Sequence, residues 1–302
     1  MKIRLPTLAS DRERGIALVL ITMALFAGYD AISKYLTRFY PVTELLWARY
    51  VMHAVFMLAV FGPRMRLDLV RTHHPVLQIA RSAFLVASTF LFMSGLRYLP
   101  LADATAINFV TPLLVTALSI PMLGEKVEAR ARIAVLVGFG GVLIIIRPGG
   151  GMLQLAAALP FLAACCSSLY QVFTRKYRRS ENPITLHFYT GLIGVAATSI
   201  GWQSDWTMPT LAHSLLLVFH AFSATFGHYL LILAYQRIWP AAAAPFTYTQ
   251  LVWSLLFGWT LYGEAPDAGS LFGIAVIVTS GMYVARRLSG RKAISGDSNR
   301  GR

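Results

Sequence analysis

Residues 101–127 read LADATAINFVTPLLVTALSIPMLGEKV, and residues 240–266 read PAAAAPFTYTQLVWSLLFGWTLYGEAP. The two stretches align without a gap at an offset of 139 residues, and each carries a Gly-Glu dipeptide at the same place near its end. The same offset brings Arg147 onto Arg286. The chain therefore contains an internal repeat. The shared dipeptides are Gly124, Glu125, Gly263 and Glu264.

The composition indicates that most of the chain lies in lipid. Of its 302 residues, 56% are hydrophobic and 13% are charged, and the mean hydropathy is +0.59. A soluble protein carries about 25% charged residues. The formal net charge of +14 does not indicate a nucleic-acid partner, because the basic residues lie in short connections between apolar runs, as they do at the cytoplasmic flanks of membrane helices.

Ten apolar segments follow one another along the chain, and most approach the roughly 20 residues that cross a bilayer. The fifth is the shortest, because its uncharged core covers only residues 133–146. It spans the membrane if Arg130 and Arg132 extend back to the interface. The predicted spans are 15–36, 43–61, 76–96, 101–123, 130–146, 152–174, 184–202, 210–235, 239–262 and 268–285.

The distribution of basic residues predicts the orientation. If the N-terminus is cytoplasmic, the cytoplasmic connections hold 21 of the 27 Lys and Arg residues and the opposite connections hold 4. This asymmetry agrees with the positive-inside rule. Omitting the fifth span would move the basic cluster at 175–179 to the outside. We therefore expect ten spans with both termini in the cytoplasm of a bacterial inner membrane.

Each half has five spans, an odd number, so the second half must be inverted relative to the first. Inverted repeats with a binding site near the midplane recur among secondary transporters. We predict an all-α membrane protein of ten transmembrane helices in two inverted five-helix repeats. The repeats are expected at residues 15–147 and 152–286, with cytoplasmic tails at 1–14 and 287–302.

The chain resembles the drug/metabolite transporter superfamily, in the branch with two EamA domains. Three features carry the resemblance: the stretch GLRYLPLADATAINFVTPLLVTALS at 95–119, the paired Gly-Glu dipeptides, and Arg49 in LLWARY. With the repeat, they cover residues 15–287. The resemblance implies a cavity lined by the first, third and fourth helices of each half. It also implies transport of small organic solutes, most often export.

Other classes of function lack their usual motifs. No G-x-x-x-x-G-K-[ST] sequence is present, so we expect no nucleotide and a driving force from gradients or substrate exchange. His220 and His228 share the eighth span but lie about 80° apart around it, which is a poor arrangement for one metal ion. We expect no catalytic residue, no metal and no cofactor. A membrane-embedded enzyme or a lipid flippase is the alternative class.

Polar and aromatic residues on the expected cavity helices are the candidates for substrate contact. The alternative for each is a simple contact between helices. Pro112 and Pro245 each remove a backbone donor at membrane depth, which is tolerated where the freed carbonyls line a cavity or meet a neighbour. The cavity candidates are Tyr29, Asp30, Asn108, Thr111, Tyr170, His220, Ser223, Tyr248 and Gln250.

Two acidic residues have competing interpretations. Asp30 could form an interfacial pair with Lys34 one turn later. Alternatively, it takes part in proton coupling or in gating, because ionisable residues at membrane depth are costly and are often functional. For Glu44 and Arg49 we expect a structural ion pair.

We expect a secondary transporter of a small amino-acid-derived metabolite, and we expect the direction of transport to be export. The mixture of Asn, Gln, Tyr and His suits a zwitterionic solute. The chain looks more similar to exporters of opine-type metallophores than to carriers of riboflavin or S-adenosylmethionine, and an importer of those two is the alternative. An exporter could also meet a periplasmic or outer-membrane efflux partner.

Overall fold

The computed structural model describes residues 11–124, 127–147, 152–177, 181–200, 207–238 and 240–297, and these residues are helical apart from short connections. Glu125 of the repeat motif lies outside the described residues. The first repeat contains α1 Asp11–Leu36, α2 Val42–Met65, the 3-10 helix η1 Arg66–Leu69, α3 Pro75–Leu96, α4 Leu101–Asn108, α5 Thr111–Leu123 and α6 Ala129–Ile146. The second contains α7 Met152–Tyr177, α8 Pro183–Ile200, α9 Leu211–Arg237, α10 Pro240–Thr247, α11 Thr249–Tyr262 and α12 Ala268–Asp297.

The predicted all-α membrane architecture is confirmed. Within the described part of the chain, nine segments are long and apolar enough to cross a membrane. The short fifth segment is one of them, as α6. The remaining predicted span, 239–262, is divided into α10 and α11, which correspond to α4 and α5. At the ends, α1 begins at Asp11 and α12 runs to Asp297, so both helices continue past the repeat boundaries that we expected.

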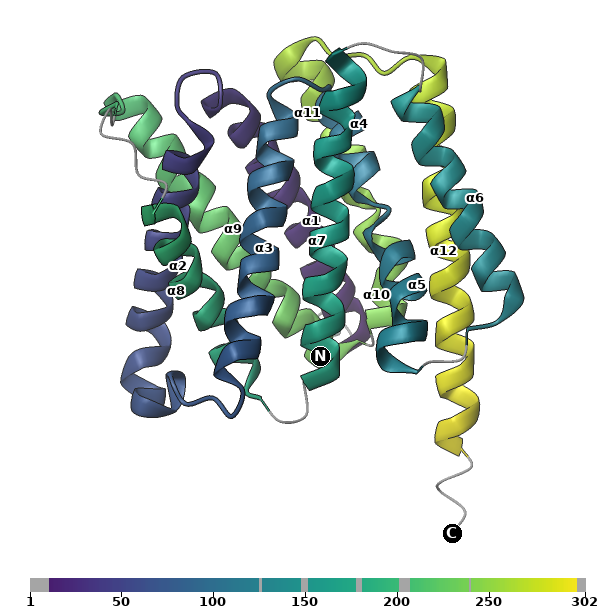
Figure 1. The fold of residues 1–302 in the computed structure, drawn as a ribbon, viewed down its shortest axis with the longest axis horizontal. Coiled ribbons are helices and arrows are strands. Elements are labelled where there is room, and N and C mark those ends of the chain that lie inside the picture. Colours follow the sequence, from purple (N-terminus) through teal and green to yellow (C-terminus); the bar gives the residue numbers. More distant parts are fainter. Residues whose placement is uncertain are drawn as a thin grey trace, which may run out of the picture.

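The two repeats run in opposite directions. In Figure 1, α4 begins at the upper end of the bundle and α10 begins toward the lower end, so equivalent helices enter from opposite sides. Gly124 and Gly263 end α5 and α11 with φ of 66° and 67°. This left-handed conformation costs a glycine little, which explains why both repeats place one there. Following the predicted orientation, we call the end where α4 begins the outer end.

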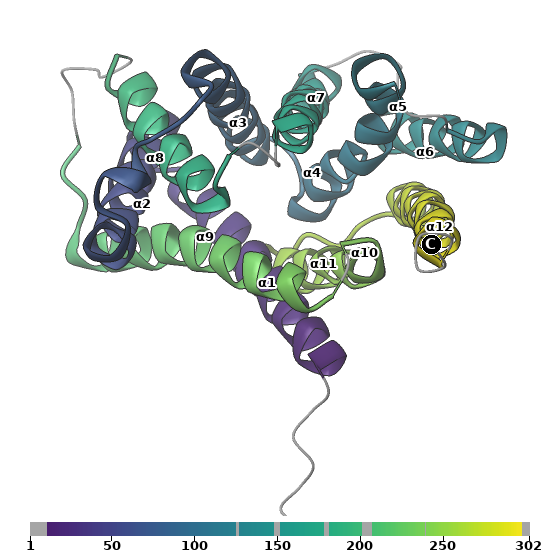
Figure 2. The ribbon, with the colours of Figure 1, turned by 90° about the horizontal axis from the view of Figure 1, so that it is seen from below.

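The helices form two rows that mix both repeats (Figure 2), with α2 and α8 at one end and α6 and α12 at the other. The main packing partners are α1 with α9, α3 with α7, and α6 with α12. By chain order, α1 of the first repeat is equivalent to α7 of the second, and α3 is equivalent to α9. The α1–α9 and α3–α7 contacts are therefore two copies of the same interface. Each main packing therefore joins one repeat to the other.

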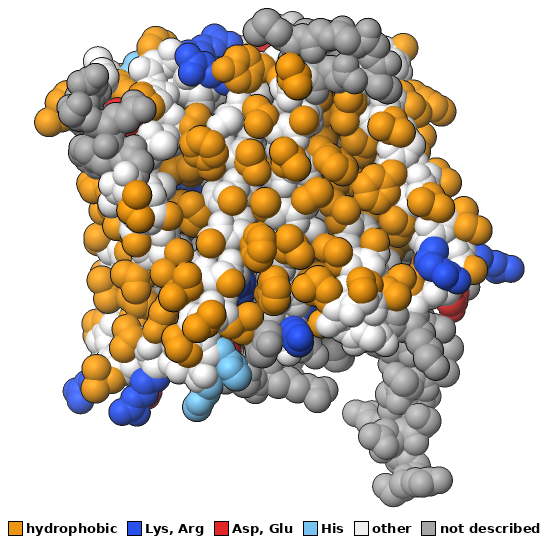
Figure 3. Space-filling view, viewed as in Figure 1, with side chains coloured by type: hydrophobic (Ala, Val, Ile, Leu, Met, Phe, Trp, Pro, Cys, Tyr) orange, Lys and Arg blue, Asp and Glu red, His pale blue; other side chains and the backbone are white. Residues whose placement is uncertain are grey.

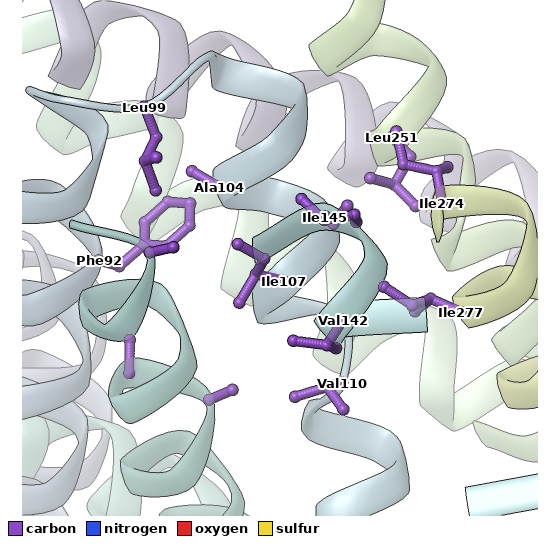
Figure 4. Packing of buried hydrophobic residues seen from close by; sticks show 14 of the residues in the cluster. Phe92, Leu99, Ala104, Ile107, Val110, Val142, Ile145, Leu251, Ile274 and Ile277 are labelled. Atoms are coloured by element: carbon purple, nitrogen blue, oxygen red, sulfur yellow. The ribbon is translucent and has the colours of Figure 1, made fainter. Parts of the chain in front are cut away.

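The largest apolar core lies between the repeats. Its residues come from α1, α3, α4, α5 and α6 of the first repeat and from α7, α11 and α12 of the second. Figure 4 shows Ile107 of α4, and Val110 just after the end of α4, facing Val142 and Ile145 of α6. Ile277 of α12 lies beside them. Because both halves supply this core, neither half buries its apolar surface alone.

Glycines allow the closest helix crossings. A Cβ atom at Gly141 of α6 would lie 2.9 Å from the carbonyl oxygen of Gly273 in α12, and one at Gly273 would lie 2.8 Å from the oxygen of Gly141. On α8, Gly191 and Gly194 leave room for the rings of His53 and Tyr50 of α2. Small residues at crossings are typical of membrane helices, since they let backbones approach closely.

The outer surface of the bundle is apolar along its middle. Figure 3 shows hydrophobic side chains over this face, with Lys and Arg side chains toward its ends. Large apolar residues such as Leu136 and Leu143 of α6 and Trp259 of α11 are more than half exposed. A soluble monomer rarely exposes so continuous an apolar surface, whereas lipid covers it in a membrane.

Candidate functional site

A group of polar side chains, all buried except the half-buried Gln250, lies where α1 meets α2, α9 and α11. We call it the central cluster, and its interactions join the two repeats. Asp30 on α1 is 4% exposed, and its Oδ2 accepts a hydrogen bond of 2.9 Å from Nε2 of Gln250 on α11. Ser33 lies within 2.9 Å of Nε2 of His220 on α9. The cluster consists of Tyr29, Asp30, Ser33, Arg49, His220 and Gln250.

Tyr29 is at the centre of this cluster. Its hydroxyl accepts a hydrogen bond of 2.9 Å from Nη1 of Arg49 and donates to the sulfur of Met93 at 3.7 Å. Its ring stacks on the imidazole of His220 with 4.3 Å between centroids. The ring and the hydroxyl of one residue therefore hold α1, α2, α3 and α9 together at the site.

Arg49 does not form the predicted ion pair with Glu44. Ion pairs among the described residues include Lys34–Glu264, Arg71–Asp68 and Arg147–Asp267, and none joins Glu44 to Arg49. The Arg49 guanidinium lies instead over the rings of Tyr29 and Tyr50, at 5.0 and 5.1 Å from their centroids. The reason is geometric: five residues along a helix correspond to about 140° of rotation, so Glu44 and Arg49 lie on different faces of α2.

Asp30 does not pair with Lys34. The Lys34 ammonium contacts Oε1 of Glu264 at 2.5 Å and the carbonyl oxygen of Leu99 at 2.5 Å. The other oxygen of Glu264, Oε2, accepts a hydrogen bond of 2.9 Å from the Leu101 amide, at the N-terminus of α4. We call these four residues the outer latch, because they join α1, α4 and the end of α11 at the outer end of the bundle.

The turn that ends α11 positions Glu264. The Gly263 amide bonds the carbonyl of Trp259, and the Glu264 amide bonds the carbonyl of Gly258, at 3.0 and 2.9 Å. The first of these bonds is the one that often closes a helix at a left-handed glycine. It returns the Glu264 carboxylate to the side of α11 that faces α1 and α4.

A second ion pair lies beyond the membrane spans at the same end of the bundle. Asp267 accepts a hydrogen bond from Arg147, and its Oδ1 also accepts one from the Ser270 amide at the start of α12. The hydrogen bond from Arg147 lowers the pKa of Asp267 to about 2. The pair therefore stays charged at physiological pH and connects the ends of α6 and α12.

Ser223 and Asn108 each contribute a buried polar atom that has no hydrogen-bond partner in the described residues. Ser223 lies one turn after His220 on α9, and its Oγ is unpaired, as are Nδ1 of His220 and Oδ1 of Asn108. Buried polar atoms are nearly always paired, so such atoms need an explanation. A polar ligand would supply the missing partners.

The helix breaks hold Thr111 and Tyr248. Thr111 donates to the carbonyl of Asn108 at 2.7 Å, which caps the gap between α4 and α5. Tyr248 separates α10 from α11, and its ring lies 5.1 Å from that of Phe109 at the equivalent break. The two discontinuities of the repeats therefore meet inside the bundle.

Tyr170 belongs to a different group of residues. Its ring lies 4.9 Å from the guanidinium of Arg81 on α3, and not in the central cluster. Arg81 is 1% exposed and donates to the carbonyl of Leu186, to Thr174 and to Thr190. Neutral acceptors from α7 and α8 therefore hold this buried cation.

Sequence reasoning missed a set of packed histidines beside the cluster. His53 of α2 lies 4.3 Å from His187 of α8, ring to ring, and its Nδ1 is 3.3 Å from Oγ1 of Thr225 on α9. His187 in turn lies 5.6 Å from His228. The available signal was a histidine inside each of the spans 43–61 and 184–202. In the part of the chain that the structure describes, no three His, Cys, Asp or Glu residues are placed to hold a metal ion.

Comparison with known proteins identifies the architecture. The model of the EamA-like transporter family matches residues 13–147 and 154–286 of this chain. The chain belongs to the EamA-like transporter family. EamA-like proteins are part of the drug/metabolite transporter superfamily, so this EamA-like chain is a membrane transporter and not an enzyme.

Two named relatives align over most of this EamA-like chain. An S-adenosylmethionine uptake transporter of Rickettsia bellii is 25% identical over 281 residues, covering 93% of this chain and 96% of the relative. A riboflavin transporter of Brucella anthropi is 28% identical over 228 residues, covering 73% of this chain and 80% of the relative. Neither name matches the opine-metallophore exporters to which the sequence looked more similar.

A crystal structure of another protein has the same fold. It superposes with a TM-score of 0.63 at 20% sequence identity, over 90% of this chain and 98% of the other. At that identity the likeness concerns the fold alone. In this EamA-like fold, the central cluster combines a cation, a carboxylate, an amide and two stacked rings, which are the kinds of group that orient a polar solute in a binding site.

Proposed function

We propose that this chain imports a small, polar, amino-acid-derived metabolite across a bacterial inner membrane. The observation that carries the proposal is the bond between Asp30 and Gln250, which joins the two repeats beside Arg49. In transporters built from inverted repeats, the site between the repeats is where a solute binds, because rocking of one repeat against the other exposes it to each side.

The names of the relatives support import. The S-adenosylmethionine carrier of Rickettsia bellii is described as an uptake transporter. S-Adenosylmethionine and riboflavin share a planar heteroaromatic ring, which suits a site built around the stacked rings of Tyr29 and His220. Export, an opine-type metallophore and an efflux partner remain predictions from sequence, and nothing among these relatives favours them.

The test compares a deletion strain of the source bacterium with its parent, in rich and in metal-poor medium. Untargeted profiling of cells and medium is expected to show a compound that the parent removes from the medium and the mutant leaves there. The opposite pattern, in which a compound accumulates inside the mutant and is lost from its medium, would establish export. No difference in either medium would contradict the proposed substrate class.

Purified protein in proteoliposomes tests transport directly. Uptake of labelled S-adenosylmethionine and of labelled riboflavin is measured for the wild-type chain and for Gln250→Leu, which removes the amide that bonds Asp30. We expect uptake of one solute by the wild type and a loss of at least tenfold in the variant. Gln171→Leu is the matched control, because Gln171 is an exposed residue of α7 outside the cluster.

A further inference from the structure

We propose that the central cluster binds a zwitterion, with the acid group of the solute on Arg49 and its cationic group on Asp30. This inference rests on the proposed function, since it assigns a substrate class to the same site. It follows from two buried charged side chains of the same cluster that form no ion pair with any described residue.

Arg49 is a buried cation without an ionic partner in the described structure. The side chain is 8% exposed, and its one hydrogen bond is to the neutral hydroxyl of Tyr29. A guanidinium has five N–H donors in a fixed planar arrangement that suits a carboxylate. Most of this donor capacity therefore remains available to a solute.

Asp30 is a buried acid in the corresponding situation. Its partner is the neutral amide of Gln250, and the one cation within a helical turn, Lys34, is bound to Glu264 in the outer latch. An ionised carboxylate can accept about four hydrogen bonds. An ammonium or other cationic group of a solute would supply the missing counter-charge.

The two charged side chains lie in the same cluster but do not pair with each other. Asp30 follows Tyr29 directly on α1, and the Tyr29 hydroxyl accepts the hydrogen bond from Nη1 of Arg49, yet no ion pair joins Asp30 to Arg49. Buried unpaired charges are costly in a membrane protein. One solute that carries both charges satisfies both residues, whereas a neutral solute leaves each without a partner.

This arrangement predicts strong discrimination. A site whose buried polar groups need partners rejects an analogue that lacks them far more strongly than an apolar pocket rejects a missing methyl group. The site should therefore favour a solute of the S-adenosylmethionine type, with free amino and carboxyl groups, over a neutral solute such as riboflavin.

The experiment measures ligand-induced thermal stabilisation of the purified full-length chain in detergent. The probes are S-adenosylmethionine, histidine and tryptophan, each with its carboxyl methyl ester and its N-acetyl derivative, and riboflavin. For at least one amino acid, we expect the unmasked form to bind at least tenfold more tightly than either masked form. Equal stabilisation by a masked form or by riboflavin, or none by any zwitterion, would overturn the proposal.

Two variants assign the charges. Asp30→Asn should no longer distinguish the free amine from its N-acetyl form, while it still prefers the acid over the ester. Arg49→Gln should show the reverse pattern. Asp68→Asn is the matched control, because Asp68 is exposed and lies outside the cluster. If both variants keep both preferences, the assignment is wrong.

The same measurements separate the inference from the function. If proteoliposomes or cells take up a metabolite but the preferences for free amino and carboxyl groups are absent, the zwitterion site fails and the transporter proposal stands. If a zwitterion stabilises the chain with the expected pattern and no solute crosses a membrane, the proposed function fails.

Discussion

Arg49 is held by a hydroxyl and two aromatic faces instead of a carboxylate. Cation–π contacts of this kind hold a guanidinium in place without neutralising it. An ion pair with Glu44 would have cancelled the charge. No ion pair neutralises Arg49 among the described residues, which leaves its charge for the acid group of the solute that we propose.

Tyr29→Phe should weaken transport while leaving the fold intact. The substitution keeps the ring that stacks on His220 but removes the hydroxyl that bonds Arg49. A hydrogen bond to a charged group contributes about 1.5–3 kcal/mol, which corresponds to roughly a tenfold to hundredfold loss of apparent affinity. The apparent affinity is measured from the dependence of uptake in proteoliposomes on solute concentration.

The matched control for Tyr29 is Tyr40→Phe. The Tyr40 hydroxyl bonds Nδ1 of His213 at 2.8 Å, away from the cluster. Uptake that falls equally in both variants would show that hydroxyl loss acts through general packing and not through Arg49.

Single residues were predictable from sequence where a helix has one polar face. The structure joins Asp30 to the half-buried Gln250 by a hydrogen bond and stacks His220 on the neighbouring Tyr29, but contact of these residues with a substrate stays a prediction. The Glu44–Arg49 pair was wrong, because closeness in sequence was taken for closeness in space. Lys34 could not be assigned, because its partner Glu264 follows it by 230 positions and reaches it only through the turn that ends α11.

At the level of helices, the contact between α6 and α12 depends on two glycines. Gly141→Leu should lower the thermal unfolding midpoint in detergent, because the new side chain would meet the backbone of Gly273, which cannot rotate away. Overpacking of this kind lowers the free energy of unfolding by about 1–3 kcal/mol. Each kcal/mol lowers the thermal unfolding midpoint by about 2–4 °C in a chain somewhat smaller than this one.

Gly140→Leu is the control for the α6 crossing. It adds the same side chain one position earlier, where a Cβ atom has no neighbour within 4 Å. An equal loss of stability in both variants would assign the effect to the flexibility of glycine and not to the crossing.

The outer latch should control access from the outside. Glu264→Gln removes the charge that attracts Lys34 and retains an oxygen for the Leu101 amide. With Cys165 and Cys166 replaced by alanine and a reporter cysteine at Ala31, the labelling rate by a membrane-impermeant maleimide should rise severalfold.

Asp267→Asn provides the comparison for the latch. It makes the same change of acid to amide at the same end of the bundle, but in the pair with Arg147. Labelling that is unchanged by Glu264→Gln, or raised equally by both variants, would show that Lys34 and Glu264 do not close the outer end.

The positions of the spans were predictable because each is an apolar run bounded by charges or turns. The breaks in the fourth and ninth spans were not recognised as breaks between separate helices. Pro112 and Pro245 indicated a missing donor, but the residue at which each helix stops depends on packing between the two breaks, where Phe109 contacts Tyr248.

For the molecule as a whole, the basic residues predict one orientation. Reporter fusions at residue 72 and at the C-terminus should be active on the cytoplasmic side, and fusions at residues 98 and 265 should be active on the other. The reason is the excess of Lys and Arg in the first set of connections. Activity of the 265 fusion in the cytoplasm would exclude an inverted second repeat.

The paired packing of the helices has a consequence for the origin of the chain. The α1–α9 interface recurs as α3–α7, and α2–α8 and α6–α12 each join equivalent helices. A five-helix ancestor that inserted in both directions could therefore make the same contacts with a second copy of itself, as an antiparallel homodimer. Gene duplication and fusion would then need to add only a linker and an uneven distribution of positive charge, which gives each half a single direction of insertion.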